Sequence, residues 1–227
     1  MNLAFPNSHC PHCQAAIKPW QNIPVVSYLV LGGKCGNCSQ RISPRYPIIE
    51  LVTAGLSAAL LLQFDASTAL LGALLLTWSL VTLTMIDFDH KLLPDDITLP
   101  LMWLGIALNA MNTYVDLQSS VLGAMLGYLS LWSVYWVFKL LTGKEGMGYG
   151  DFKLLAALGA WLGWQAVPLI ILLSSVVGAV CGIAIMIAQR RGKDVPIPFG
   201  PYLAAAGWIC LIWGDEIMVT YFGAAGI

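Results

Sequence analysis

Charged residues are scarce in this chain of 227 residues. Asp, Glu, Lys and Arg make up 10% of it and hydrophobic residues 58%, whereas a soluble domain is about 25% charged and about 45–50% apolar. The net charge of −1 gives no basic surface for a nucleic acid, so no such partner is expected. The first twenty residues lack the apolar core of a cleavable signal peptide, so none is expected either. These absences leave a polytopic membrane protein, which we expect to be all-α.

The hydrophobic residues form runs long enough, or nearly so, to cross about 30 Å of hydrocarbon as helices. Residues 154–189 are the difficult case, because 36 uncharged residues are too many for one span and too few for two, which need about 40. We predict a short helix over about residues 151–163, a turn near Trp161 and Trp164, and a full helix that ends at residue 188. The other predicted segments are 48–64, 66–86, 97–115, 117–138, and 201 to 213 or beyond. The sequence therefore predicts about seven membrane segments, one of them short.

All eleven Lys and Arg residues lie in four places along the chain. They precede the first predicted segment, follow the second, surround the glycine-rich loop that starts the fifth, and follow the sixth. The loops near Asp65 and Asp116 and the end of the chain carry none. Because basic loops stay in the cytoplasm, these four regions are predicted to be cytoplasmic. The short fifth segment must then cross the membrane, since otherwise Arg190 and Arg191 would face outside.

Two C-x-x-C pairs stand in the only sizeable polar region, residues 1–46. Cys10 and Cys13 form the first pair and Cys35 and Cys38 the second, with twenty-one residues between them. This spacing, slightly wider than usual, suits a tetrahedral four-thiolate zinc site; two disulfides or redox pairs are the alternative. Zinc is favoured because the region is predicted to be in the reducing cytoplasm and is too small for a core of its own. Four Cys ligands leave no open position for water, which argues against a zinc-dependent hydrolase.

Two acidic motifs interrupt the uncharged sequence. A D-F-D motif that begins at Asp87 ends the second predicted segment, and a G-Y-G-D motif that ends at Asp151 starts the fifth. Acids beside apolar spans are costly and mark functional sites, and the charge pattern puts both at the cytoplasmic face. If the two acids touch, two carboxylates about 3 Å apart cannot both ionise, so the pair holds one proton. The ionised acid can then activate water while the protonated acid polarises a carbonyl, which is peptide hydrolysis.

Neighbouring acids have structural explanations as well as functional ones. Asp89 stands two residues from Asp87, so on a helix the two point apart and one of them faces the site. Asp151 taken alone suits a helix N-cap. Asp95 is either a helper acid or an N-cap, and we favour the N-cap. Glu50 lies just inside the first predicted segment, where an acid is either functional or paired, here with Arg45.

Taken together, these motifs resemble the bacterial type IV prepilin peptidases, which are bifunctional leader peptidases and N-methyltransferases. The resemblance covers essentially the whole chain. It rests on the paired Cys knuckles and on R-Y-P-I-I-E at 45–50, D-F-D to L-P-D at 87–95, G-Y-G-D-F-K at 148–153 and P-I-P-F-G-P at 196–201. The G-x-G-D motif alone is a weak signal, but the set in this order and spacing is specific.

The resemblance implies a membrane aspartyl protease of the G-x-G-D type, with Asp87 and Asp151 as its catalytic pair. Such enzymes cut the basic leader of prepilins and pseudopilins after a Gly, at the cytoplasmic face of the bacterial inner membrane. They then methylate the new N-terminal residue, usually Phe, with S-adenosyl-L-methionine, and the products serve type IV pilus and type II secretion assembly. Candidate supporting residues in the same motifs are Asp89, Asp95, Gly148, Gly150 and Lys153.

No glycine-rich fingerprint of the Rossmann type is visible for binding of the methyl donor, so Glu50 and the Cys region are named as candidates only. We expect Lys91, Lys144 and Lys153 to face lipid headgroups, because the substrate leader is itself basic.

Family members with Cys knuckles normally begin with a further transmembrane helix, so we expect an N-terminally short chain. Its predicted parts are a cytoplasmic tetra-Cys region, 1–46, and a transmembrane peptidase domain, 47–227. The shortness leaves open a protease-only or non-catalytic form that acts in pilus assembly. A small cation transporter is the remaining alternative, and it is disfavoured because the acids cluster at one membrane face and no inverted repeat is visible.

Overall fold

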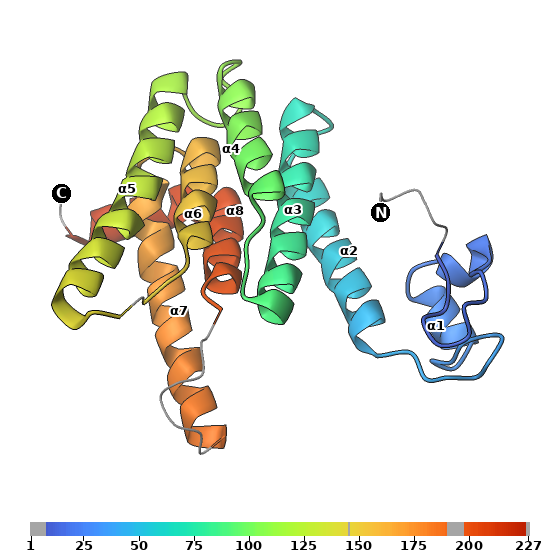
Figure 1. Cartoon of the computed structure of the whole chain (residues 1–227). Coiled ribbons are helices and arrows are strands. Elements are labelled where there is room, and N and C mark those ends of the chain that lie inside the picture. The colour runs from blue at the N-terminus through green and yellow to red at the C-terminus, as the bar shows by residue number, and fades with distance from the viewer. Residues whose placement is uncertain (1–7, 145, 190–197, 226–227) are drawn as a thin grey trace. The chain divides into compact units, whose positions relative to one another are not determined.

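A computed structural model describes residues 8–144, 146–189 and 198–225 of the chain. Within these residues the regular elements are helices, apart from two isolated β-bridges, so the all-α prediction is confirmed (Figure 1). The elements are η1 (Pro19–Asn22), α1 (Val26–Val30), α2 (Arg45–Gln63), α3 (Thr68–His90), α4 (Asp95–Asn109), α5 (Leu117–Thr142), α6 (Tyr149–Leu162), α7 (Ala166–Gln189) and α8 (Gly200–Ala225).

Helices α2 to α8 correspond to the seven predicted segments. Five of them, α2, α3, α5, α7 and α8, are long and apolar enough to cross a membrane. The other two are shorter, with 15 residues in α4 and 14 in α6, or about 22 Å at 1.5 Å per residue. The short fifth segment was therefore predicted correctly. The third was not, because α4 ends at Asn109 and the predicted segment continued to residue 115.

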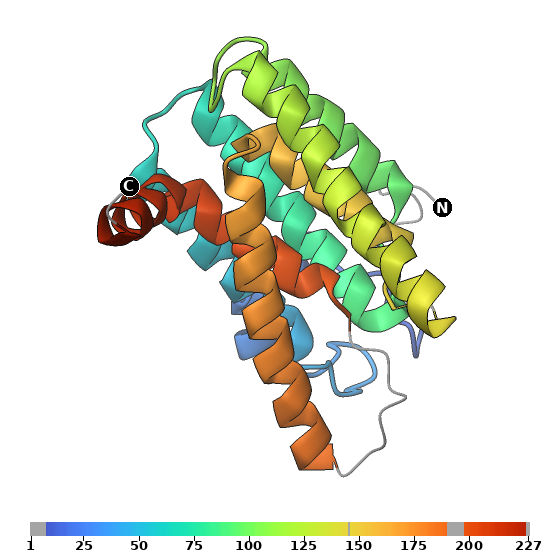
Figure 2. The ribbon, with the colours of Figure 1, turned by 90° about the vertical axis from the view of Figure 1, so that its left-hand side faces the viewer.

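The chain divides into two compact units, Met1–Ala59 and Leu60–Ile227. The first contains the Cys knuckles and most of α2, and the second contains the remaining helices. Figure 2 shows α8 crossing behind α7 in the second unit. The predicted functional division into residues 1–46 and 47–227 stays a prediction.

Helix α6 is the central helix of the second unit. It packs against α4, α5, α7 and α8, and every residue from 154 to 161 is buried. The reason lies in its composition, since the stretch alternates leucine with alanine and glycine and ends on the fully buried Trp161. Small residues allow neighbouring backbones to approach closely. The helix that starts with the G-Y-G-D motif is thus enclosed on all sides.

Glycines bring α5 directly against α6. Gly123 and Gly127 stand one turn apart on α5, a spacing that favours close helix packing. A Cβ on Gly127 would lie 2.5 Å from the carbonyl oxygen of Leu155, and one on Gly123 would collide with the carbonyl of Gly159. The two backbones therefore touch, and this contact fixes α6 against α5.

Polar side chains from α4 and α5 terminate α6. The amide of Asn109 donates to the carbonyls of Ala160 and Trp161 at 2.9 and 3.1 Å, and Ser120 Oγ donates to the Ala160 carbonyl at 2.5 Å. Asn109 Oδ1 in turn accepts the N–H groups of Tyr114 and Val115 at 3.0 and 3.2 Å. Asn109 thus caps the end of α6 and holds the loop that follows α4, which explains why α4 stops before residue 115.

Candidate active site

Asp87 and Asp151 come together from different helices. Asp87 lies in the last turn of α3 and Asp151 in the first turn of α6, and their side chains are only 5% and 7% exposed. They lie close enough for their charges to interact directly. Asp89 is exposed, as expected for a residue two positions from Asp87 on a helix. The fold therefore buries one acid from each motif in the same place.

A backbone N–H group holds each carboxylate. The N–H of Gly200 donates to Asp87 Oδ2 at 3.0 Å, and the N–H of Gly148 donates to Asp151 Oδ2 at 3.3 Å. Both bonds are charge-assisted when the acid is ionised. Gly200 belongs to the P-I-P-F-G-P motif at 196–201, but the sequence predicted no role for this glycine. The first two residues of that motif lie outside the described residues.

Leu93 fills the space between Gly150, which precedes Asp151, and Gly200, which binds Asp87. Leu93 is 4% exposed, and a Cβ on Gly150 would lie 2.7 Å from the Cβ of Leu93. A Cβ on Gly200 would lie 2.7 Å from Asp87 Oδ2 and 3.1 Å from a Leu93 methyl group. Glycine is required at both positions because these neighbours leave no room for a side chain. Sequence reasoning missed Leu93, which looked like an ordinary apolar residue.

The helix caps differ from the prediction. Gly148 is the N-cap of α6. Asp151 is the third residue of the helix, and its carboxylate accepts a hydrogen bond from the N–H of Gly148. Pro94 is the N-cap of α4, so Asp95 is the first helical residue and not the cap. Asp95 is used by a contact with another helix, whereas Asp151 accepts the N–H of its own N-cap.

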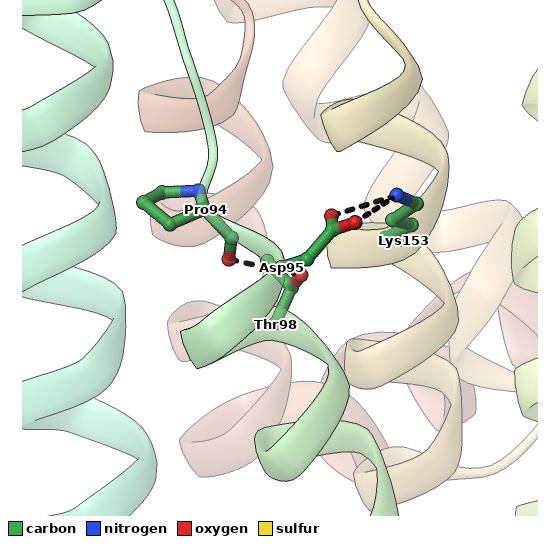
Figure 3. A network of polar contacts seen from close by, with 4 residues as sticks. All are labelled: Pro94, Asp95, Thr98 and Lys153. Carbon is green, nitrogen blue, oxygen red and sulfur yellow. Dashed lines mark hydrogen bonds and ion pairs between the residues drawn. The ribbon is translucent and has the colours of Figure 1, made fainter.

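Asp95 contacts Lys153. The ammonium group of Lys153 lies 2.7 Å from Oδ1 and 2.7 Å from Oδ2 of Asp95, so the expectation that Lys153 faces lipid headgroups is wrong (Figure 3). Lys91 and Lys144 are exposed, and their predicted headgroup contacts stay a prediction. Lys91 ends α3 in the left-handed conformation, with φ 55°.

The four knuckle cysteines form one cluster in the first unit. The sulfurs of Cys10, Cys13, Cys35 and Cys38 all lie within 4.8 Å of one another, and Cys10 and Cys38 are 3.9 Å apart. A tetrahedral site with zinc–sulfur bonds of about 2.3 Å has sulfurs about 3.8 Å apart, so the geometry fits a metal. All four cysteines are free of disulfides, which favours the metal over two disulfide bonds.

The two knuckles repeat the same hydrogen bonds. The N–H of Cys10 donates to the carbonyl of residue 15 at 3.0 Å, and the N–H of Cys35 donates to that of residue 40 at 2.8 Å. Hydrogen bonds from the Ala15 backbone and the Asn37 side chain lower the pKa of the Cys13 thiol to about 6. Backbone hydrogen bonds from Cys38 and Asn37 also lower the pKa of Cys35. Thiolates are the form that binds zinc.

Glu50 serves a backbone turn in the first unit. Its Oε2 accepts the N–H of Val25 at 2.7 Å, and Val25 has a φ of 61°, which is strained for a β-branched residue. The Val26 N–H bonds to the Pro24 carbonyl across this residue, closing a γ-turn. Glu50 thus stabilises a strained turn between α1 and η1, a contact that the sequence did not indicate.

Known proteins resemble this chain over nearly its whole length. The chain matches the type IV leader peptidase family over residues 74–183 and the bacterial peptidase A24 N-terminal domain over residues 1–64. Prepilin leader peptidase/N-methyltransferases of Pseudomonas aeruginosa, Aeromonas hydrophila and Legionella pneumophila are 56%, 58% and 46% identical to it. These alignments cover 99%, 97% and 98% of this chain and 78%, 76% and 78% of the relatives. No solved structure matches the chain. The resemblance seen in the motifs is confirmed, and the chain belongs to the type IV leader peptidase family.

Proposed function

We propose that this chain cleaves the leader peptide of type IV prepilins and pseudopilins with Asp87 and Asp151, and then N-methylates the new N-terminal residue. One observation carries the peptidase assignment. Two buried carboxylates from the ends of α3 and α6 interact with each other, and a backbone N–H group holds each of them. Buried acids with a like-charged neighbour are the arrangement that aspartyl hydrolysis requires.

The reaction follows from one shared proton. The ionised carboxylate accepts a proton from a water molecule, whose oxygen attacks the scissile carbonyl carbon. The protonated carboxylate donates its proton to the carbonyl oxygen, giving a tetrahedral diol. When the diol collapses, the carboxyl group that took the water proton gives it to the leaving nitrogen, the other carboxylate takes a proton from a diol hydroxyl, and the carbon–nitrogen bond breaks. The hydrogen bonds from Gly200 and Gly148 keep both acids oriented throughout.

The charge pattern supports a cytoplasmic active site in the bacterial inner membrane. The end of α3 and the start of α6 lie beside Lys91 and Lys144 in the connecting loops and Lys139 in the last turn of α5, and such basic regions remain in the cytoplasm. Arg190 and Arg191 lie outside the described residues. Membrane lipid surrounds the helices, and a substrate that enters from the cytoplasm reaches the acids without crossing the membrane.

The four-Cys cluster supports a structural zinc ion, which would tie together a unit with a small core. Four thiolates close its coordination sphere, so zinc would take no part in hydrolysis. The methyl group comes from S-adenosyl-L-methionine, and Glu50 and the Cys region remain the candidates for its binding. Glu50 accepts the N–H of Val25, which gives this side chain a structural role as well.

Two other functions are less well supported. A cation transporter needs acids near the middle of the membrane, whereas Asp87 lies three residues before the end of α3 and Asp151 two after the start of α6. A non-catalytic assembly factor has no need for two interacting buried acids, because each costs folding free energy.

The deciding experiment is cleavage of a prepilin by this chain in membranes, with and without a chelator and with the Asp151→Asn variant. We expect cleavage that resists the chelator and disappears in the variant. Cleavage retained by the variant would remove Asp151 from the catalytic role. A folded, unmutated chain that cleaves no prepilin, and still cleaves none when an N-terminal helix is added, would refute the peptidase function.

A further inference from the structure

We infer that Asp95 and Lys153 are positioning residues for the peptidase reaction. Their ion pair holds Leu93 against two glycines, Gly150 beside Asp151 and Gly200, which binds Asp87. The inference rests on the proposed function of Asp87 and Asp151. Both positioning residues act through packing and not through contact with the substrate. They come from α4 and α6, helices that pack against each other.

The ion pair is well formed although it is partly exposed (Figure 3). Lys153 Nζ lies 2.7 Å from both oxygens of Asp95, and the side chains of Lys153 and Asp95 are 25% and 53% exposed. Ion pairs this exposed contribute little to fold stability, because water screens them. The pair joins residues 58 positions apart in the sequence. Its main effect is therefore to fix the start of α4 to the start of α6.

Asp95 stands at a favourable place in its helix. It is the first residue of α4, where the positive end of the helix dipole favours an anion. Lys153 is the fifth residue of α6, and its ammonium group contacts this carboxylate. The ion pair thus joins the first turn of α4 to the second turn of α6.

The two partners lie next to the contacts that shape the site. Asp95 follows Leu93 by two residues, and Lys153 follows Gly150 by three. A Cβ on Gly150 would come within 2.7 Å of the Leu93 Cβ, and one on Gly200 within 3.1 Å of a Leu93 methyl. The ion pair therefore helps to hold Leu93 against both glycines. Without it, the start of α4 loses one of its links to α6, and Leu93 shifts relative to Gly150 and Gly200.

The start of α4 is rigid enough to transmit this constraint. Pro94 has its φ fixed near −65°, and Thr98 Oγ1 donates to the Pro94 carbonyl at 3.2 Å (Figure 3). The first turn of α4 is thus closed on itself. A displacement of Asp95 therefore moves Pro94 and Leu93 with it.

The test uses steady-state kinetics on a prepilin substrate with the full chain in proteoliposomes. We expect Asp95→Asn and Lys153→Gln each to lower kcat about tenfold or more, because small misplacements of catalytic groups have large effects on rate. KM and the melting temperature should stay close to those of the unmutated chain. Asp96→Asn and Lys144→Gln are matched controls that remove the same charges from exposed neighbouring positions, and both should retain full kcat.

Two further variants separate positioning from general structural damage. The exchanged pair Asp95→Lys with Lys153→Asp rebuilds the ion pair and should recover most of the lost kcat. Leu93→Ala should lower kcat like the single charge variants, and combining it with Asp95→Asn should add little, because both act through the same contact. Leu92→Ala is its control, since Leu92 is 60% exposed.

Unchanged kcat in both single charge variants, with Asp151→Asn inactive, would overturn the positioning role and leave the proposed peptidase function intact. The positioning role would also be overturned if kcat of the exchanged pair were no higher than the product of the fractional kcat values of its two single exchanges. The positioning role would likewise be overturned if kcat fell only in variants whose melting temperature also fell. An inactive unmutated chain would instead refute the proposed function, and this inference with it.

Discussion

The backbone N–H of Gly200 bonds to Asp87 Oδ2 at 3.0 Å, across 113 residues of sequence. The bond joins the start of α8 to the end of α3 and fixes one acid of the candidate pair. Asp151 is held in the same way by its own helix, through the N–H of Gly148. The two acids differ in how they are held, because one depends on a distant segment and the other on a local turn.

Asp87→Asn and Asp151→Asn should each lower the rate of leader cleavage about a thousandfold or more, because each removes one member of the pair that supplies the general acid and the general base. Methylation of a substrate that has already been cut should persist. The measurement is the separate assay of cleavage and of methyl incorporation on prepilin and on mature pilin.

Asp89→Asn is the control for this pair, since Asp89 lies in the same motif and is exposed. It should cleave at close to the unmutated rate. Substantial cleavage in both Asp87→Asn and Asp151→Asn would show that the acids of the reaction lie elsewhere.

Gly200→Ala should reduce cleavage about a hundredfold. The new Cβ would lie 2.7 Å from Asp87 Oδ2 and 3.1 Å from a Leu93 methyl, so the carboxylate or the start of α8 must shift. Gly214→Ala is the matched control on the same helix, because its Cβ would meet only Cys210 at an ordinary 3.7 Å. Equal activity in the two variants would mean that the contact at Gly200 does not govern the site.

Asn109→Leu should lower the free energy of unfolding by about 2–4 kcal/mol, because the end of α6 and the loop after α4 lose hydrogen bonds together. Ser120→Ala removes a single bond to the same Ala160 carbonyl and should cost about 1 kcal/mol. Denaturation of the purified protein by titrated detergent compares the two variants. Losses of equal size would indicate that Asn109 does not act on both segments.

The helices of this protein were predictable because a membrane leaves a strong signal in composition. Uncharged runs gave seven segments, and the length of 154–189 even revealed that one must be short. The end of α4 was not predictable, because it depends on the hydrogen bonds of Asn109 to a helix 51 residues further along the chain. No local pattern encodes such a partner.

The sequence pointed to the two acids of the candidate site, but not to the residues that position them. Asp87 and Asp151 stood out as charges in an apolar sequence, and the positive-inside pattern placed them at one depth. The roles of Leu93 and Gly200 depend on contacts between distant segments, so their residue types carried no signal. Lys153 was misinterpreted for the same reason, since its partner Asp95 is far away in the sequence and near in the fold.

Zinc analysis should find about one zinc ion per chain, held by the four knuckle sulfurs. Cys13→Ser should reduce the zinc content and loosen the first unit, because the metal replaces a hydrophobic core there. The peptidase reaction should continue, since its acids belong to the second unit. The measurement pairs metal analysis with the cleavage assay. Cys181→Ser is the control, because Cys181 lies outside the sulfur cluster; an equal loss of zinc in both variants, or no zinc in the unmutated chain, would contradict the site.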